Sequence, residues 1–165
     1  MDETSLTIRN EIWHELSEVV FDVKYLSLFV SNQKKILDRI ETISLIFIIV
    51  SAIGWFQKVE HSFWWMMVII TTKVVHYFRS SFFTSQERIL EMKDFEIVLN
   101  RRKIELEELW SKFNIGDISN TKAIDRLKKL RLSEISDKYN AEVPDEKRIN
   151  RKASHFRNNY MKKFQ

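Results

Sequence analysis

Residues 42–78 contain two long apolar runs in a chain that is otherwise rich in charge, and this contrast constrains the fold most strongly. The first run, residues 42–57, has sixteen residues without a charge, and the second begins at Ser62 and is interrupted by Lys73. A helix that spans a bilayer needs about 20 mostly apolar residues. Each run alone fits a buried helix of a soluble protein, but only four residues join the two. Two apolar helices joined so tightly are typical of a two-pass hairpin, and we predict a transmembrane hairpin at residues 42–78.

Basic and aromatic residues around the two runs support the same prediction. Trp55, Trp64 and Trp65 lie close to the connection, as in the aromatic belt of a bilayer interface. The connection holds a single basic residue, Lys58, whereas several flank the outer ends of the hairpin: Lys34, Lys35, Arg39, Arg79 and Arg88. An excess of lysine and arginine marks the cytoplasmic side of a membrane. We therefore expect both termini to be cytoplasmic.

The residue types that are rare in this chain predict a helical protein without a catalytic site. Two glycines and one proline leave little to break helices. The absence of cysteine excludes disulfides, cysteine metal ligands and a cysteine nucleophile. The histidines are scattered, and no nucleophile motif or phosphate-binding loop occurs, so we expect no enzyme, no metal site and no cofactor. Residues 1–30 also lack the pattern of a cleaved secretory signal.

Residues 1–41 carry apolar side chains at alternating spacings of four and three, from Ile12 and Leu16 onward. This heptad pattern predicts a helix over residues 6–39, with Glu15 on its outer face. The apolar seam packs either on later helices of the same chain or on another copy, as a coiled coil.

A second heptad seam follows the hairpin and predicts a helix over residues 85–113. Its positions, which are candidates for an oligomer contact, are Met92, Phe95, Leu99, Arg102, Leu106, Leu109 and Phe113. Arg102 is the polar exception, and it either fixes register in an assembly or points to solvent. We hypothesise that the two seams build a bundle around a symmetry axis.

One face of the second apolar run carries two ionisable residues, Lys73 and His76, three positions apart. An ionisable residue in a span normally faces a bundle interior or a water-filled path. The candidate pore-lining residues on this face are Met66, Ile69, Lys73, His76 and Ser80. Alternatively, the lysine stem reaches the inner headgroups and lines no pore.

The net positive charge of the protein comes entirely from its C-terminal region. Residues 119–165 carry thirteen Lys and Arg against six Asp and Glu, whereas residues 1–118 carry fourteen against seventeen. Basic clusters bind anionic lipid headgroups or nucleotide phosphates, and without a glycine loop we favour the lipid surface. The candidates are Lys122, Arg126, Lys129, Lys147, Arg148, Arg151 and Lys152. No motif for binding duplex nucleic acid is present.

The order of parts resembles the SLATT-type two-transmembrane effectors of bacterial anti-phage defence, including the membrane effector of the Hailong type of system. The resemblance covers the helix pattern of roughly residues 20–113 and extends to no residue signature. The parts are an N-terminal cytoplasmic helix (1–41), the two-pass hairpin (42–78), a long cytoplasmic helix (79–118) and a basic helical region (119–165). The predicted fold class is an all-α membrane protein: a transmembrane hairpin with long N- and C-terminal cytoplasmic helices.

The resemblance implies a homo-oligomeric, pore-forming effector of the bacterial inner membrane that depolarises it during phage infection. It also implies a partner nucleotidyltransferase whose nucleotide or oligonucleotide product opens the pore or holds it shut. Membrane lipid is a further expected partner. The competing functions are a non-conducting membrane-anchored adaptor that recruits a cytoplasmic partner, and a soluble all-helical bundle.

Overall fold

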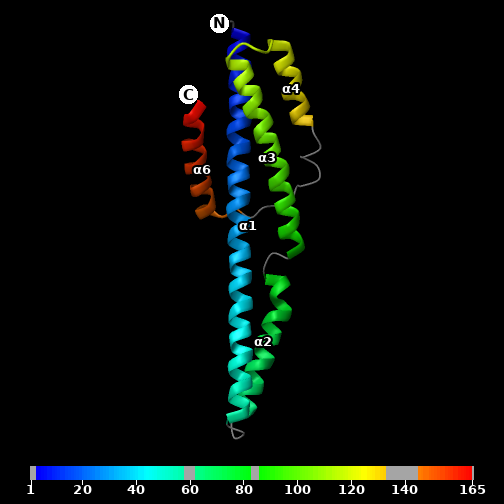
Figure 1. Ribbon diagram of the computed structural model, residues 1–165, viewed down its shortest axis with the longest axis vertical. Coiled ribbons are helices and arrows are strands. Elements are labelled where there is room, and N and C mark those ends of the chain that lie inside the picture. The colour runs from blue at the N-terminus through cyan, green and yellow to red at the C-terminus, as the bar shows by residue number, and fades with distance from the viewer. Residues whose placement is uncertain (1–2, 58–61, 83–85, 133–144, 165) are drawn as a thin grey trace. The chain divides into compact units, whose positions relative to one another are not determined.

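The structure, a computed structural model, describes residues 3–57, 62–82, 86–132 and 145–164. Side chains at 54–57, 62, 75–76, 78–82 and 132 are outside this description. The described elements are all helical (Figure 1): α1 (Glu3–Gln57), α2 (Ser62–Phe82), α3 (Gln86–Asn114), α4 (Asn120–Leu132), α6 (Lys147–Met161) and the short 3-10 helix η2 (Lys162–Phe164). The expectation of helices is therefore confirmed for the described residues.

The chain divides into two compact units, and each is described by itself. The first unit comprises residues 1–29 and 92–165, and its described helices are the first part of α1, most of α3, α4 and α6; we call it the four-helix unit after these described helices. The two-helix unit comprises residues 30–91, with the second part of α1 and all of α2. The predicted boundary after residue 41 falls inside α1, and the one after residue 78 falls inside α2.

One apolar core joins all four helices of the four-helix unit. Helix α1 supplies the heptad residues Ile12 and Leu16, which are completely buried. Leu106 and Leu109 of α3 enter the same core, as do Ala123 and Leu127 of α4 and Met161 of α6. Burial of large aliphatic side chains stabilises a fold by about 1.5 to 3 kcal/mol each, so this core defines the unit.

Helix α3 ends in a Schellman motif at the glycine that the sequence places there. Gly116 has a φ of 75°, a left-handed conformation that costs other residues energy. The Asp117 amide donates to the Lys112 carbonyl at 2.9 Å, and the Gly116 amide donates to the Phe113 carbonyl at 3.2 Å. These bonds satisfy two carbonyls at the helix end and turn the chain toward α4.

The predicted transmembrane hairpin is wrong. Among the described residues, no helix is both long enough and apolar enough to cross a membrane. The uncharged part of α1 is sixteen residues long and continues a helix that carries Asp38, Arg39 and Glu41, while Lys73 interrupts α2. Both stretches fall short of the roughly 20 apolar residues that a span needs. The expectations that depended on this hairpin are corrected with it: a membrane protein, an ion channel, a pore, and a location in the inner membrane with both termini cytoplasmic.

Candidate functional surfaces

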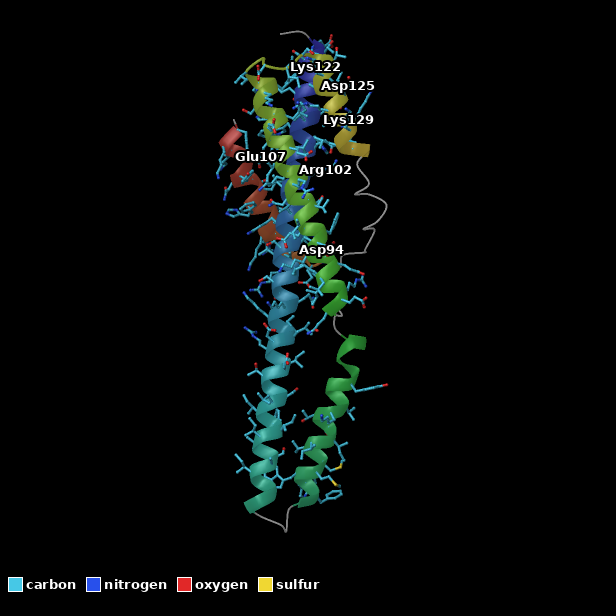
Figure 2. All side chains as sticks on the ribbon, turned by 45° about the vertical axis from the view of Figure 1, so that its right-hand side comes forward. Asp94, Arg102, Glu107, Lys122, Asp125 and Lys129 are labelled. Carbon is cyan, nitrogen blue, oxygen red and sulfur yellow. The ribbon has the colours of Figure 1, made fainter. Side chains whose placement is uncertain are left out.

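Two arginines from different helices converge on one carboxylate in the four-helix unit. Arg102 of α3 donates from Nη2 to Oε2 of Glu15 at 3.0 Å, and Arg131 of α4 donates from Nε to Oε1 of Glu15 at 2.8 Å. Arg131 also donates from Nη2 to Oε2 of Glu11 at 3.2 Å. The hydrogen bonds and charge of the two carboxylates, Glu15 first, raise the pKa of Arg131. Figure 2 labels Arg102 on α3.

This carboxylate–arginine cluster bears on two expectations from the sequence. Glu15 was expected on the outer face of its helix, but its side chain is only 19% exposed, because α3 and α4 both pack beside it. Arg102, at 17% exposure, points at Glu15 rather than at solvent. Its Nε is buried and has no hydrogen-bond partner among the described residues. The cluster ties α1, α3 and α4 together through charge-assisted hydrogen bonds, which are stronger than neutral ones.

The predicted oligomer seam lies largely inside the protein's own core. Met92, Leu99, Leu106 and Leu109 are buried, whereas Phe95 and Phe113 are half-buried. Leu106 and Leu109 contact the core that α1 builds, in which Phe113 also packs.

A different set of α3 residues faces outward. Ile97 and Ile104, seven positions apart, are 57% and 55% exposed.

Tyr160 of helix α6 contacts two residues of α3. Its phenol donates a hydrogen bond to Glu107 of α3, and the Lys103 ammonium lies 5.2 Å from the centre of its ring. Burial, followed by the bond to Glu107, raises the pKa of Tyr160 to about 12. Ile149, Ala153 and Met161 are the buried residues of the helix. Sequence periodicity did not reveal these contacts, because residues 133–146 separate α6 from the heptad pattern.

The basic candidates fall into two groups with different surroundings. On α6, Lys147, Arg148, Arg151 and Lys152 are all exposed, and none has an ion-pair partner among the described residues. The α4 group is Lys122, Arg126 and Lys129, which are also exposed. Figure 2 shows Asp125 on the same short helix as Lys122 and Lys129, so the α4 surface carries a carboxylate among its cations.

A groove lies between α1 and α6 in the same unit. It encloses about 650 Å³, and Trp13 and His14 line its α1 side, while Arg157, Asn158 and Lys162 line its α6 side. The Trp13 ring packs against Trp110, with 5.0 Å between ring centres. The groove also contains Asn10 and Glu18, so it combines an aromatic wall with two cations, two carboxamides and one carboxylate.

The two-helix unit has an extensive apolar surface. Fifteen large apolar side chains between residues 43 and 77 are 37% to 80% exposed. Those of α1 are Ile43, Leu45, Ile46, Phe47, Ile48, Ile49, Val50 and Ile53, and those of α2 are Phe63, Trp64, Met66, Met67, Ile70, Val74 and Tyr77. A patch this large on a folded protein normally marks an interaction site. A cavity of about 550 Å³ between the helices is lined mostly by apolar residues, including Phe47 and Trp64.

Three of the predicted pore-lining residues have described side chains in the two-helix unit. Met66 is exposed, Ile69 is half-buried, and the Lys73 side chain is exposed. Lys73 lines a cavity of about 160 Å³ together with Glu41 of α1. The side chains of His76 and Ser80 lie outside the described residues.

Comparisons with protein-family models, with curated proteins and with solved structures give no match. Within the described part of the chain, no three histidine, aspartate or glutamate side chains gather closely enough to hold a metal ion. The resemblance to SLATT-type effectors therefore rests on the order of helices alone. What the geometry itself offers is an apolar surface on one unit and a cationic helix on the other.

Proposed function

We propose that the protein is a homo-oligomeric helical effector that assembles through the apolar surface of its two-helix unit. The observation that supports this proposal is the exposure of apolar side chains at six consecutive positions of α1, residues 45–50. Consecutive residues of an α-helix point about 100° apart, so six of them reach every side of the helix. A helix that is apolar all round is normally buried. Contact with α2 covers one side only, which leaves the other sides of this helix available to a partner.

The size and the charge of the surface favour a second copy as the occupant. If each of the fifteen side chains contributes roughly 60 Å² of apolar area, well below the 150 to 250 Å² that an aromatic residue can bury, the total is on the order of 900 Å². One partner in a stable protein interface buries about 800 Å². Residues 42–57 carry no charge, so the matching surface must also be uncharged. The same surface of another copy meets this requirement, and a contact of this self-complementary kind closes as a twofold-symmetric dimer.

The test compares the native mass of the wild type with that of two matched double variants. Ile46→Asp with Ile53→Asp places two charges seven residues apart on α1, where the side chains are 54% and 52% exposed. Ile97→Asp with Ile104→Asp makes the same change at the same spacing on α3, at 57% and 55% exposure. We expect wild type and the α3 variant to sediment as oligomers of the 20.0 kDa chain, and the α1 variant to sediment as a monomer.

Three results would contradict the proposal. The wild type could remain a monomer at about 50 µM, where a specific assembly should be populated by mass action. The two double variants could lose mass equally. Wild type could also require detergent to stay in solution, or pellet with phosphatidylcholine vesicles as a monomer, in which case lipid rather than another copy covers the surface.

The role in anti-phage defence, with a nucleotidyltransferase as partner, is a further part of the proposal and rests on the resemblance. We expect the protein, expressed together with its neighbouring genes, to lower the number of phage plaques on its host. The assembly-deficient α1 variant should lose this protection, and the α3 variant should keep it. Equal protection by both variants would show that protection against phage does not depend on assembly.

A further inference from the structure

The groove between α1 and α6 is lined by side chains of opposite charge that do not pair with one another. Its α1 wall carries Glu18, and its α6 wall carries Arg157 and Lys162. Among the described residues, the ion-pair partner of Glu18 is His14 on the same helix, with 3.5 Å between Nδ1 and Oε1, and no ion pair joins Glu18 to either cation. Opposite charges that line one groove without neutralising each other are complementary to a ligand that carries both charges.

Contacts between α1 and α6 fix the two walls of the groove. The guanidinium of Arg157 lies 5.6 Å from the centre of the Phe21 ring, and the ammonium of Lys24 lies 4.7 Å from the centre of the Phe156 ring. Met161 of α6 is buried in the core to which α1 contributes. Figure 1 shows α6 alongside the first part of α1. The groove therefore lies between two helices that pack against each other, as in the largely preformed sites that bind small molecules.

An aromatic side chain, a thioether and two carboxamides complete the lining. The Trp13 indole packs against Trp110, with 5.0 Å between ring centres, and also lines the groove. Met161 lines it from the α6 side, and both an indole and a thioether make favourable contacts with an aromatic ring. Asn10 and Asn158 can each donate and accept hydrogen bonds. The volume of about 650 Å³ is that of a small-molecule site.

We propose that this groove binds a free aromatic α-amino acid. Such a molecule carries an ammonium, a carboxylate and an aromatic ring, and the groove offers a partner for each. The ammonium donates to the Glu18 carboxylate, the ligand carboxylate accepts from Arg157 and Lys162, and the ring packs against Trp13. A polyanion fits less well, because it would bring negative charge against the Glu18 carboxylate.

Binding is measured by NMR, as the shift of the Trp13 indole signal during titration with phenylalanine at constant ionic strength. The Glu18 side chain is 59% exposed, so its contact with the ligand is partly screened by water, and we expect a Kd on the order of 0.1 to 1 mM. Three analogues each lack one of the recognised groups: phenylpropionate lacks the ammonium, phenylalaninamide the carboxylate and alanine the ring. Each analogue should bind at least about tenfold more weakly than phenylalanine.

Two groove variants assign the charged contacts. Glu18→Gln should bind phenylalanine about tenfold more weakly, and it should bind phenylpropionate, which has no ammonium, at least as tightly as the wild type does. Arg157→Gln with Lys162→Gln should likewise bind phenylalanine about tenfold more weakly and phenylalaninamide at least as tightly as the wild type does. The control, Arg148→Gln with Arg151→Gln, removes the same charge from α6 outside the groove and should change the affinity less than about twofold.

Four results would overturn the inference. Phenylalanine could cause no shift up to about 10 mM, well above the expected Kd. Phenylpropionate or phenylalaninamide could bind as tightly as phenylalanine, the α6 control could weaken binding as much as the groove variant on the same helix, or Glu18→Gln could weaken phenylalanine and phenylpropionate equally. The assembly-deficient α1 variant should bind phenylalanine normally, so failure of the assembly proposal leaves this test intact.

Discussion

Replacement of Glu15 by glutamine tests whether the carboxylate–arginine cluster holds the four-helix unit together. Glutamine keeps the shape of the side chain and one acceptor oxygen, but it removes the charge and one of the two oxygens that Arg102 and Arg131 share. Hydrogen bonds to charged groups contribute about 1.5 to 3 kcal/mol, and partial exposure of Arg131 lowers this figure. We expect a loss of about 2 kcal/mol in the free energy of unfolding, or about 4 to 8 °C in Tm for a chain of this length.

The assay is thermal unfolding followed by circular dichroism, with Glu18→Gln as the matched control. Glu18 lies on the same helix, but its side chain is 59% exposed and its ion-pair partner among the described residues is the exposed His14, so its replacement should change stability by less than about 0.5 kcal/mol. Combining Glu15→Gln with Arg131→Gln should cost about 1 kcal/mol less than the sum of the single changes, because both remove the same interaction. Equal Tm values for Glu15→Gln and Glu18→Gln would refute the reasoning.

Three further changes test individual parts of the fold. Leu106→Ala, at a completely buried position, should lower the free energy of unfolding by about 2 to 5 kcal/mol, and Ile104→Ala, at an exposed one, by no more than about 0.5 kcal/mol, as measured by urea denaturation. Gly116→Ala should cost about 1 kcal/mol in the same assay because alanine disfavours a φ of 75°, although nothing lies within 4 Å of the added methyl group. In an absorbance titration, one of the four tyrosines should ionise near pH 12 and be lost in Tyr160→Phe. Because folding raises this pKa, the stability that the phenol contributes should be complete below its ordinary pKa of about 10 and disappear as the pH rises through 12.

The local order of the chain could be predicted because it depends on neighbouring residues. Heptad spacing predicted the long helix now seen as α3, and Gly116 marked where it ends. The partners of Glu15 could not be predicted, because Arg102 and Arg131 lie 87 and 116 residues away in the chain. Periodicity places Glu15 on a side of α1, but only the packing of α3 and α4 decides whether solvent reaches that side.

The hairpin prediction is wrong because it treated two apolar runs as membrane spans although each is shorter than a span requires. The short connection and the tryptophans near it favoured a bilayer, but neither feature increases the number of consecutive uncharged residues in the helices. In α1 the charged residues up to Glu41 belong to the same uninterrupted helix as the apolar run, and in α2 Lys73 lies within the run. The same apolar residues are exposed on the two-helix unit, so the sequence located an apolar surface but assigned it to two membrane spans.

The most direct test of assembly measures whether the exposed apolar side chains of α1 become protected when copies associate. The chain contains no cysteine, so Ile46→Cys and Ile97→Cys each introduce one thiol, and the two positions have similar exposure in a single copy. The rate of alkylation by a maleimide is measured between about 0.1 µM and about 50 µM protein, a range over which mass action should populate an assembly. The account predicts that the thiol at position 46 reacts at least about tenfold more slowly at the higher concentration while the thiol at position 97 reacts equally fast throughout. Equal and constant rates at both positions would contradict it.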